Sequence, residues 1–243
     1  MGAAVAPPAV RGVFLDAGNT LVALDYEVIA ERIRADGHPV TAADVRGAEH
    51  RARVRLDPHL AGARSTETLD TFRLYLRYLV EGLGLAWGRA TERMAEDLRA
   101  VKPPFGLFSV EVPDAPAVLA DLRRRGLRLA VVSNSNGAVA ELLGSVGLAG
   151  LVDTIVDSGR VGVEKPDPRI FRHAAAALGI RPEEAVHVGD LYSVDVVGAR
   201  AAGARAILLD PAGAWTGVDC PTAVDLPAAA RLIAAMTATS PAP

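Results

Sequence analysis

The feature that most constrains the fold of this chain is a carboxylate at the end of a short apolar run. The segment FLDAGNTL (residues 14–21) leads from apolar residues to Asp16 and continues into a turn of small residues and a hydroxyl, Thr20. Strands of an open α/β sheet present reactive side chains in this way, at the carboxyl edge where ligands bind. We therefore predict that Asp16 lies at such an edge as a nucleophile or a metal ligand.

Polar groups that such an aspartate requires lie in three later segments. Ser133 and Asn134 end the run VVSN, Lys165 lies in EKPD, and Asp190 ends the run HVGD, with Asp195 shortly after it. The carboxyl ends of parallel strands meet at one edge of a sheet, so we expect these groups to converge. A carboxylate attacks a phosphate dianion only when a cation screens the repulsion, and the pattern therefore favours aspartate-based phosphoryl chemistry.

Short apolar runs that alternate with helical patterns indicate the fold class. Strands are predicted at residues 10–15, 127–133, 151–156, 185–188 and 206–209. Strands rich in Val, Ile and Leu that alternate with helices are typical of a parallel sheet covered on both faces. The sequence therefore predicts an α/β fold with a Rossmann-like parallel sheet.

A long interval without a comparable strand signal follows the first strand, from residue 22 to about 105. Helical spacing of apolar residues predicts helices at 26–35, 42–55, 67–83 and 90–101. A single crossover needs only one helix, so four helices indicate an inserted domain. We predict a core domain of residues 1–21 and 106–243 and a helical cap domain of residues 22–105. Residues 102–106 would be the return hinge, and the tail after residue 238 is expected to be disordered.

Composition restricts the class of protein only broadly. The chain has 243 residues, is 50% hydrophobic, and carries a net charge of −3, which gives no case for nucleic-acid binding. A single cysteine, Cys220, cannot form an internal disulfide, and no apolar run approaches the roughly 20 residues of a membrane span. The start of the chain lacks signal-peptide features, so we expect a cytoplasmic protein. The oligomeric state is not indicated.

The motifs and the position of the cap resemble those of the haloacid dehalogenase superfamily over nearly the whole chain. The resemblance implies that Asp16 attacks the substrate. It implies that Ser133 and the neighbouring amide hold the transferring group, and that Lys165 neutralises charge. The substrate would be a small phosphorylated metabolite bound between the sheet edge and the cap.

The same resemblance implies a magnesium site. The acidic pair Asp190 and Asp195 would serve Mg²⁺, with Asp16 and the carbonyl of Gly18 as further oxygen ligands. Asp195 is better placed for the outer shell of the metal or for contact with Lys165.

Substrate contacts are predicted at two places. At the sheet edge they are Gly18, Asn19, Thr20 and Asn134; in the cap they are Tyr26 and Arg64. Tyr26 follows the first motif closely, and Arg64 lies in a polar loop.

Gly18 departs from the pattern of most phosphatases in the superfamily. They carry a second aspartate two residues after the nucleophile, which protonates the leaving oxygen and then deprotonates the attacking water. Glycine can do neither, and general acid–base assistance contributes roughly 10²–10⁴-fold to a rate. We expect slow turnover of alkyl phosphates and a smaller loss with aryl or acyl phosphates.

Two alternatives remain open because of this missing acid. Metal-independent 2-haloacid dehalogenases of the superfamily also lack it, but they usually lose the acidic pair that Asp190 and Asp195 provide here. A catalytically silent binding protein would also tolerate the loss. Hydrolases of the phosphonoacetaldehyde type use a cap lysine, and residues 21–101 contain none.

Overall fold

The computed structural model of the chain describes residues 8–62, 64–100 and 106–238. Within these residues a parallel sheet of six strands forms the centre of the core. Its order is β5 (Thr154–Asp157), β4 (Arg128–Ser133), β1 (Gly12–Leu15), β6 (Ala185–Gly189), β7 (Arg205–Leu209) and β8 (Thr222–Ala223). The predicted α/β fold with a Rossmann-like sheet is confirmed.

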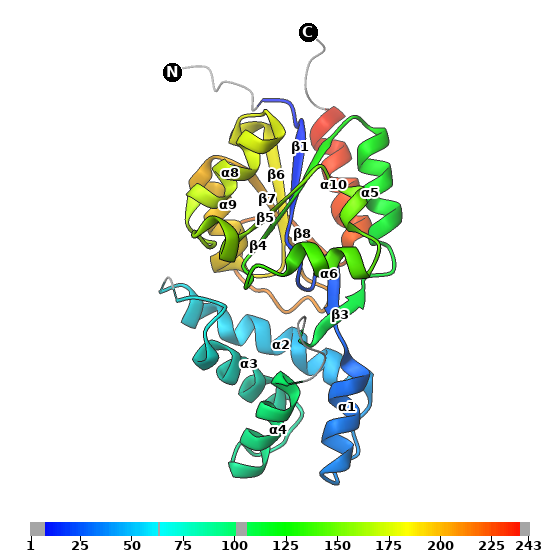
Figure 1. The fold of residues 1–243 in the computed structure, drawn as a ribbon, viewed down its shortest axis with the longest axis vertical. Helices are drawn as coiled ribbons and strands as arrows, with labels where there is room; N and C mark the ends of the chain where they lie inside the picture. The colour runs from blue at the N-terminus through cyan, green and yellow to red at the C-terminus, as the bar shows by residue number, and fades with distance from the viewer. Residues whose placement is uncertain (1–7, 63, 101–105, 239–243) are drawn as a thin grey trace.

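Side chains of the central strand alternate between two hydrophobic clusters. Val13 and Leu15 belong to the cluster that α5 (Ala115–Arg124), α6 (Val139–Ser145) and α10 (Leu226–Ala238) cover. Phe14 belongs to the opposite cluster, with residues of α8 (Pro168–Leu178) and α9 (Val197–Ala202). Figure 1 shows α5 and α10 on one side of the sheet and α8 and α9 on the other. Both faces are therefore buried, which explains why the central strands are apolar over most of their length.

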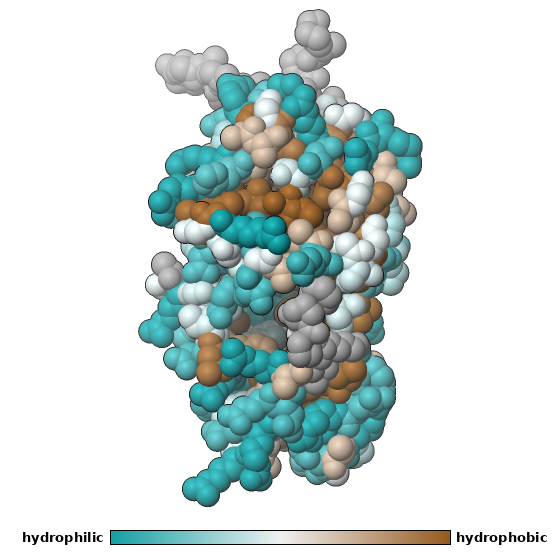
Figure 2. Space-filling model, in the orientation of Figure 1, coloured by the Kyte–Doolittle hydropathy of each residue, from teal (hydrophilic) through white to brown (hydrophobic). Residues whose placement is uncertain are grey.

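Four helices below the sheet in Figure 1 surround a hydrophobic cluster of their own. They are α1 (Tyr26–Ala35), α2 (Ala42–Leu60), α3 (Leu69–Gly82) and α4 (Arg89–Arg99). Thr41 and Asp44 form a reciprocal capping box at the start of α2, and Thr68 caps α3. Figure 2 shows that their outer surface is mostly hydrophilic. None of the described helices is both long and apolar enough to cross a bilayer.

Two short antiparallel strands connect these helices to the core, and the sequence did not predict them. β2 (Val22–Leu24) pairs with β3 (Phe108–Glu111), so the expectation that no strand lies between residues 22 and 105 was wrong. Three residues are too few to show alternation, and their partner lies beyond the whole helical insert.

The predicted end of one cap helix differs from the structure, and other predicted segments lie outside the described residues. α2 continues past the predicted end at residue 55 to Leu60, through Pro58, because Leu56 and Leu60 are buried in the cluster of the cap. The predicted hinge lies almost wholly outside the described residues, as does the tail. The division at residues 21/22 and 105/106 stays a prediction.

Truncation of Phe171 should test the packing of α8 on the sheet. Its ring is fully buried and meets the ring of His187 edge-on at 5.1 Å between centroids. We expect Phe171→Ala to lower the free energy of unfolding by about 3–5 kcal/mol in urea titrations. Val197→Ala, at a side chain that is 45% exposed, should change it by less than about 0.5 kcal/mol. Equal effects for the two variants would contradict this packing.

Candidate active site

Asp16 follows β1 directly and meets the lysine that the sequence singled out. The backbone amide of Asp16 donates to the carbonyl of Val188 at 2.9 Å, which continues the β1–β6 ladder to the edge of the sheet. Lys165 donates from Nζ to Asp16 Oδ1 at 2.5 Å, and both side chains are buried. The sheet therefore holds the carboxylate at its edge while the lysine fixes one of its oxygens.

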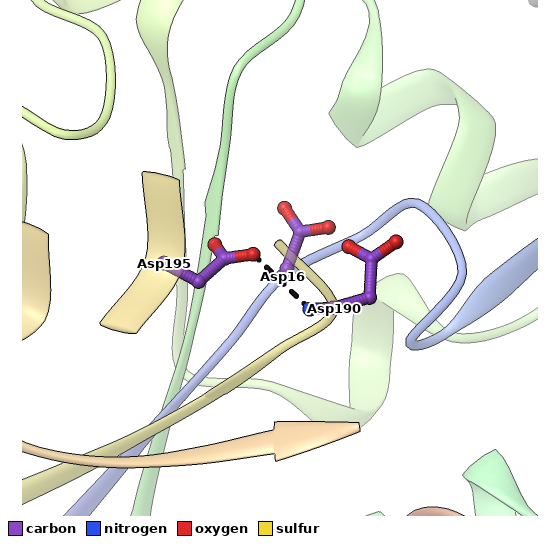
Figure 3. Close-up of side chains that lie close together, drawn as sticks. All are labelled: Asp16, Asp190 and Asp195. Atoms are coloured by element: carbon purple, nitrogen blue, oxygen red, sulfur yellow. Dashed lines mark hydrogen bonds between the residues drawn. The ribbon is translucent and has the colours of Figure 1, made fainter. Parts of the chain in front are cut away.

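Asp195 holds the same lysine from the other side. Its Oδ1 accepts from Lys165 Nζ at 2.7 Å and lies 2.9 Å from Nε2 of His187. Its Oδ2 accepts from the amides of Asp190 and Leu191 at 3.1 and 2.9 Å. Figure 3 shows the carboxylates of Asp16 and Asp190 next to each other and the bond from Asp195 to the Asp190 amide. Both oxygens of Asp195 are engaged, so its geometry suits positioning of Lys165 and of the Asp190 loop.

Burial and charge shift the titration of these groups in different directions. Burial raises the pKa of Asp16 to about 7, and the charges of Asp195 and Asp190 add to this effect, while Lys165 opposes it. Burial disfavours the charged form of Lys165, but the attraction of Asp16 and Asp195 outweighs it and raises the lysine pKa. Burial likewise opposes ionisation of Asp195, but Lys165 and His187 hold its pKa below the ordinary value. An ionised Asp195 therefore keeps Lys165 charged beside Asp16.

Asn134 acts on the loop that carries Lys165. Its Oδ1 accepts from the Lys165 amide at 2.7 Å, and its Nδ2 donates to the Lys165 carbonyl at 3.0 Å. The same Nδ2 donates to Thr66 of the cap at 3.1 Å. The preceding residue, Ser133, is buried at the end of β4 and lines the same cavity as Asp16. The predicted substrate residue Asn134 thus also fixes the lysine backbone.

A buried polar network from the cap reaches Asp190, and sequence reasoning missed it. Arg53 of α2 donates from Nη1 to Asp190 Oδ2 at 2.8 Å, and its Nε lies 2.8 Å from Glu49 Oε1. Glu49 accepts from the hydroxyls of Tyr75 at 2.6 Å and Tyr26 at 3.2 Å. Burial raises the pKa of Glu49, although Arg53 opposes the shift. The cap therefore places a cation within hydrogen-bond distance of a candidate metal ligand.

A second contact joins α2 to the segment after Asp190. Asp57 accepts from the amide of Ser193 at 2.8 Å and from its hydroxyl at 2.6 Å. Glu49, Arg53 and Asp57 are spaced four residues apart and lie on one side of the helix. That spacing, within a helix that also buries apolar residues, was the sequence signal for a polar contact across the domain boundary.

The donor set suits a divalent cation. One oxygen each of Asp16, Asp190 and Asp195 lie within 4.8 Å of one another. Within the described residues, the buried groups of this cluster comprise five carboxyl groups, Asp16, Glu49, Asp57, Asp190 and Asp195, and two cations, Arg53 and Lys165. Carboxylate oxygens are the ligands that Mg²⁺ prefers in proteins.

A cavity of about 560 Å³ opens beside these groups, between the sheet edge and the cap. Of the residues predicted to act on substrate or metal, its walls include Asp16, Gly18, Asn19, Ser133, Asn134, Lys165, Asp190 and Asp195. Thr20, Tyr26 and Arg64 are not among its lining residues. Thr20 is buried, the Tyr26 hydroxyl points to Glu49, and Arg64 is exposed. Figure 2 shows a hollow between the two parts of the molecule.

The titration of Asp16 predicts a pH dependence of stability for the metal-free protein. Because the pKa is about 7 in the fold and 3.8 ordinarily, the folded chain holds a proton that the unfolded chain has lost between these values. Stability contributed by this group therefore falls as the pH rises through this range. We expect Asp16→Asn to melt at progressively higher temperature than wild type as the pH rises, in the presence of EDTA. A difference between Asp16→Asn and wild type that stays constant with pH would contradict the raised pKa.

Comparisons with known proteins identify the family of the chain. A family model of haloacid dehalogenase-like hydrolases matches residues 10–203. Phosphoserine phosphatase of Thermus thermophilus is 50% identical over 135 residues, which are 55% of this chain and 52% of that protein. Glyceraldehyde 3-phosphate phosphatase of Methanothermobacter thermautotrophicus is 39% identical over 99 residues, which are 40% of this chain and 44% of that protein. The chain thus matches about half the length of these relatives, or less.

A solved structure extends the likeness in fold to nearly the whole chain. A HAD phosphatase from Thermococcus onnurineus is 21% identical with a TM-score of 0.57, and the match covers 92% of this chain and 98% of that one. At this identity the likeness concerns the fold alone. On the family match and the fold together, the chain belongs to the haloacid dehalogenase-like hydrolases.

Proposed function

We propose that this chain is a Mg²⁺-dependent phosphohydrolase that acts on a small phosphorylated metabolite through an aspartyl-phosphate on Asp16. The observation that carries the proposal is the buried triad of Asp16, Lys165 and Asp195 at the wall of the cavity. The phosphatases among the relatives support a phosphate ester as substrate. A cavity of about 560 Å³ suits a small molecule.

The residues present suggest a division of roles. In the first step an oxygen of Asp16 forms a bond to phosphorus, and the ester bond from phosphorus to the leaving oxygen breaks. Lys165 offsets the negative charge that accumulates around the phosphoryl group, and Ser133 lies where its hydroxyl can hold a phosphoryl oxygen. In the second step a water oxygen bonds to phosphorus, the bond from phosphorus to the Asp16 oxygen breaks, and phosphate leaves with the proton of the water while the Asp16 carboxylate is restored. Asp195 and Asn134 keep Lys165 in place through both steps.

Asp16, Asp190 and the carbonyl of Gly18 would hold the magnesium ion. When bound, the ion would screen the repulsion between the Asp16 carboxylate and the phosphate dianion. Arg53 donates a hydrogen bond to Asp190 Oδ2 at 2.8 Å, and Asn19 donates to the same oxygen at 3.0 Å. Both donors fix the orientation of the Asp190 carboxylate toward the site.

Turnover of simple phosphates should depend on both Asp16 and magnesium. We expect hydrolysis of p-nitrophenyl phosphate and acetyl phosphate that is lost to background on chelation or in Asp16→Asn, because each removes a requirement of the first step. The exposed control Asp70→Asn should retain wild-type rates. Phosphoserine and glyceraldehyde 3-phosphate belong in the same panel, measured as phosphate release.

Silence on all of these substrates would contradict the proposal. Because halide displacement needs no proton, the missing acid at Gly18 also suits a metal-independent 2-haloacid dehalogenase. Chloride release from 2-chloropropionate without metal would establish that alternative. The absence of both activities would indicate a catalytically silent binding protein.

Replacing a metal ligand should change the metal dependence of activity in a way that replacing the nucleophile does not. We expect Asp190→Asn to raise the Mg²⁺ concentration for half-maximal activity at least about tenfold, with partial recovery at high metal. Asp16→Asn should not recover at any concentration, because no other group can form the covalent bond. The measurement is activity against Mg²⁺ concentration for both variants. An unchanged metal dependence in Asp190→Asn would remove Asp190 from the ligand set.

A further inference from the structure

Gly18 occupies the position where most phosphatases of the superfamily carry their acid, and its backbone does not explain the glycine. Gly18 is not among the glycines with a left-handed φ, whereas its neighbour Asn19 has a φ of 52°. A side chain at position 18 is therefore compatible with the local conformation. The neighbours of Gly18 give the reason that position 18 has no side chain.

The ring of Phe108 lies where that side chain would begin. A Cβ on Gly18 would meet Cε1 of Phe108 at 3.3 Å, Cδ1 at 3.6 Å and Cζ at 3.8 Å. These are its three nearest neighbours, so the Cα–Cβ direction points at this one ring. The first contact is tight enough that the ring would have to yield even to an alanine. A longer acidic side chain would have to displace the ring or turn away from it.

Phe108 is held in place by both parts of the molecule. It lies on β3, paired with Leu24 of β2, and packs against both the sheet cluster and the cap cluster. It also lines the cavity beside Asp16 and Gly18. Displacing the ring would therefore disturb the junction between core and cap.

We propose that Phe108 determines the specificity of this site by filling the acid position with an apolar wall. The inference rests on the proposed function and assigns to Phe108 the substrate class that the sequence predicted from Gly18 alone. That class comprises phosphates whose leaving oxygen departs as a stable anion, as in acyl and aryl phosphates. Among nearby carboxyl groups, Asp190, Asp195 and Glu49 are engaged by Arg53, Lys165 and Tyr75 respectively. A fourth carboxyl group, Glu67 at the cavity wall, accepts from the Thr66 hydroxyl at 3.3 Å, and the variant Glu67→Gln tests whether it supplies a proton.

The chemistry follows from the missing proton. When the Asp16 oxygen bonds to phosphorus, the leaving oxygen keeps the electron pair of the broken ester bond. Without an acid at position 18 it departs as an anion: a phenolate takes a proton from water afterwards, and a carboxylate stays ionised. Alkoxides are poor leaving groups under these conditions, so alkyl phosphates should react slowly. The dependence of the rate on the leaving group therefore tests the proposal.

The kinetic test uses a series of substituted phenyl phosphates and one alkyl phosphate. For wild type, kcat/KM should fall steeply as the pKa of the leaving alcohol or phenol rises. Gly18→Asp alone should leave this slope steep, because Phe108 blocks the new carboxyl group. Gly18→Asp combined with Phe108→Ala should flatten it and raise kcat/KM for the alkyl phosphate by about 10²–10⁴-fold.

Four results would overturn the inference while leaving the proposed function intact. Two are a shallow slope in wild type and a flattened slope in Gly18→Asp alone. The third is a steeper slope in Glu67→Gln, which would assign the acid to Glu67, and the fourth is a double variant no better than Gly18→Asp. No turnover of any phosphate by wild type with Mg²⁺ would instead contradict the proposed function.

Thermal melting tests the packing independently of activity. We expect Gly18→Ala to lower the melting temperature by about 2–4 °C when Phe108 is present, and by clearly less in a Phe108→Ala background. Gly144→Ala is a matched control, because a Cβ there meets nothing within 4 Å. It should lose no stability. Equal losses for Gly18→Ala in both backgrounds would show that Phe108 does not restrict position 18.

Discussion

A buried lysine between two aspartates is the interaction on which the rest of the site depends. Lys165 contacts Asp16 and Asp195, and a buried charge is tolerated only when such partners surround it. Asp195 in turn requires His187 and the amides that follow β6. The strand ends, the lysine loop and the segment after Asp190 must therefore adopt their positions together. Removal of one charge would leave the others uncompensated in the interior.

The cap completes this electrostatic arrangement rather than merely covering it. Arg53 supplies the cation that Asp190 faces, and Glu49 balances Arg53 within the same helix. Asp57 satisfies the amide and hydroxyl of Ser193 in the core. One side of α2 therefore provides charge for the site and binds the core next to it. A cap attached only by apolar contacts would leave Asp190 without this partner.

The fold was predictable where local patterns determine it. The five predicted strands all lie in the sheet, and residues 26–35 form a helix with the predicted bounds. Continuous apolar runs specify buried parallel strands, and 3.6-residue periodicity specifies the cap helices. β2, β3 and β8 were not predicted because such short segments show no period. β2 and β3 also depend on each other across the whole helical insert.

The site was predictable where the chain order itself brings residues to the sheet edge. Asp16, Ser133, Lys165 and Asp190 come together in the structure because the strands and loops that bear them end at one edge. The contact of Arg53 with Asp190 depends on how the cap docks, and the four-residue spacing of polar residues in α2 indicates a shared polar side of the helix but not its partner. The reason for the glycines at positions 18 and 189 likewise lies in neighbours from other segments of the chain.

Gly189 illustrates why such positions need the three-dimensional structure. A Cβ there would lie 2.3 Å from the Asp195 carboxyl carbon, so the glycine makes room for the carboxylate that holds Lys165. Gly18 likewise makes room for Phe108, at a greater distance of 3.3 Å. In neither case does the backbone itself require glycine, since neither has a left-handed φ. A side chain from a different segment dictates each glycine. In one case that neighbour supplies a charge to the site, and in the other it fills the place of an acid. The chemistry available to Asp16 is thus set as much by what surrounds these two glycines as by the aspartate itself.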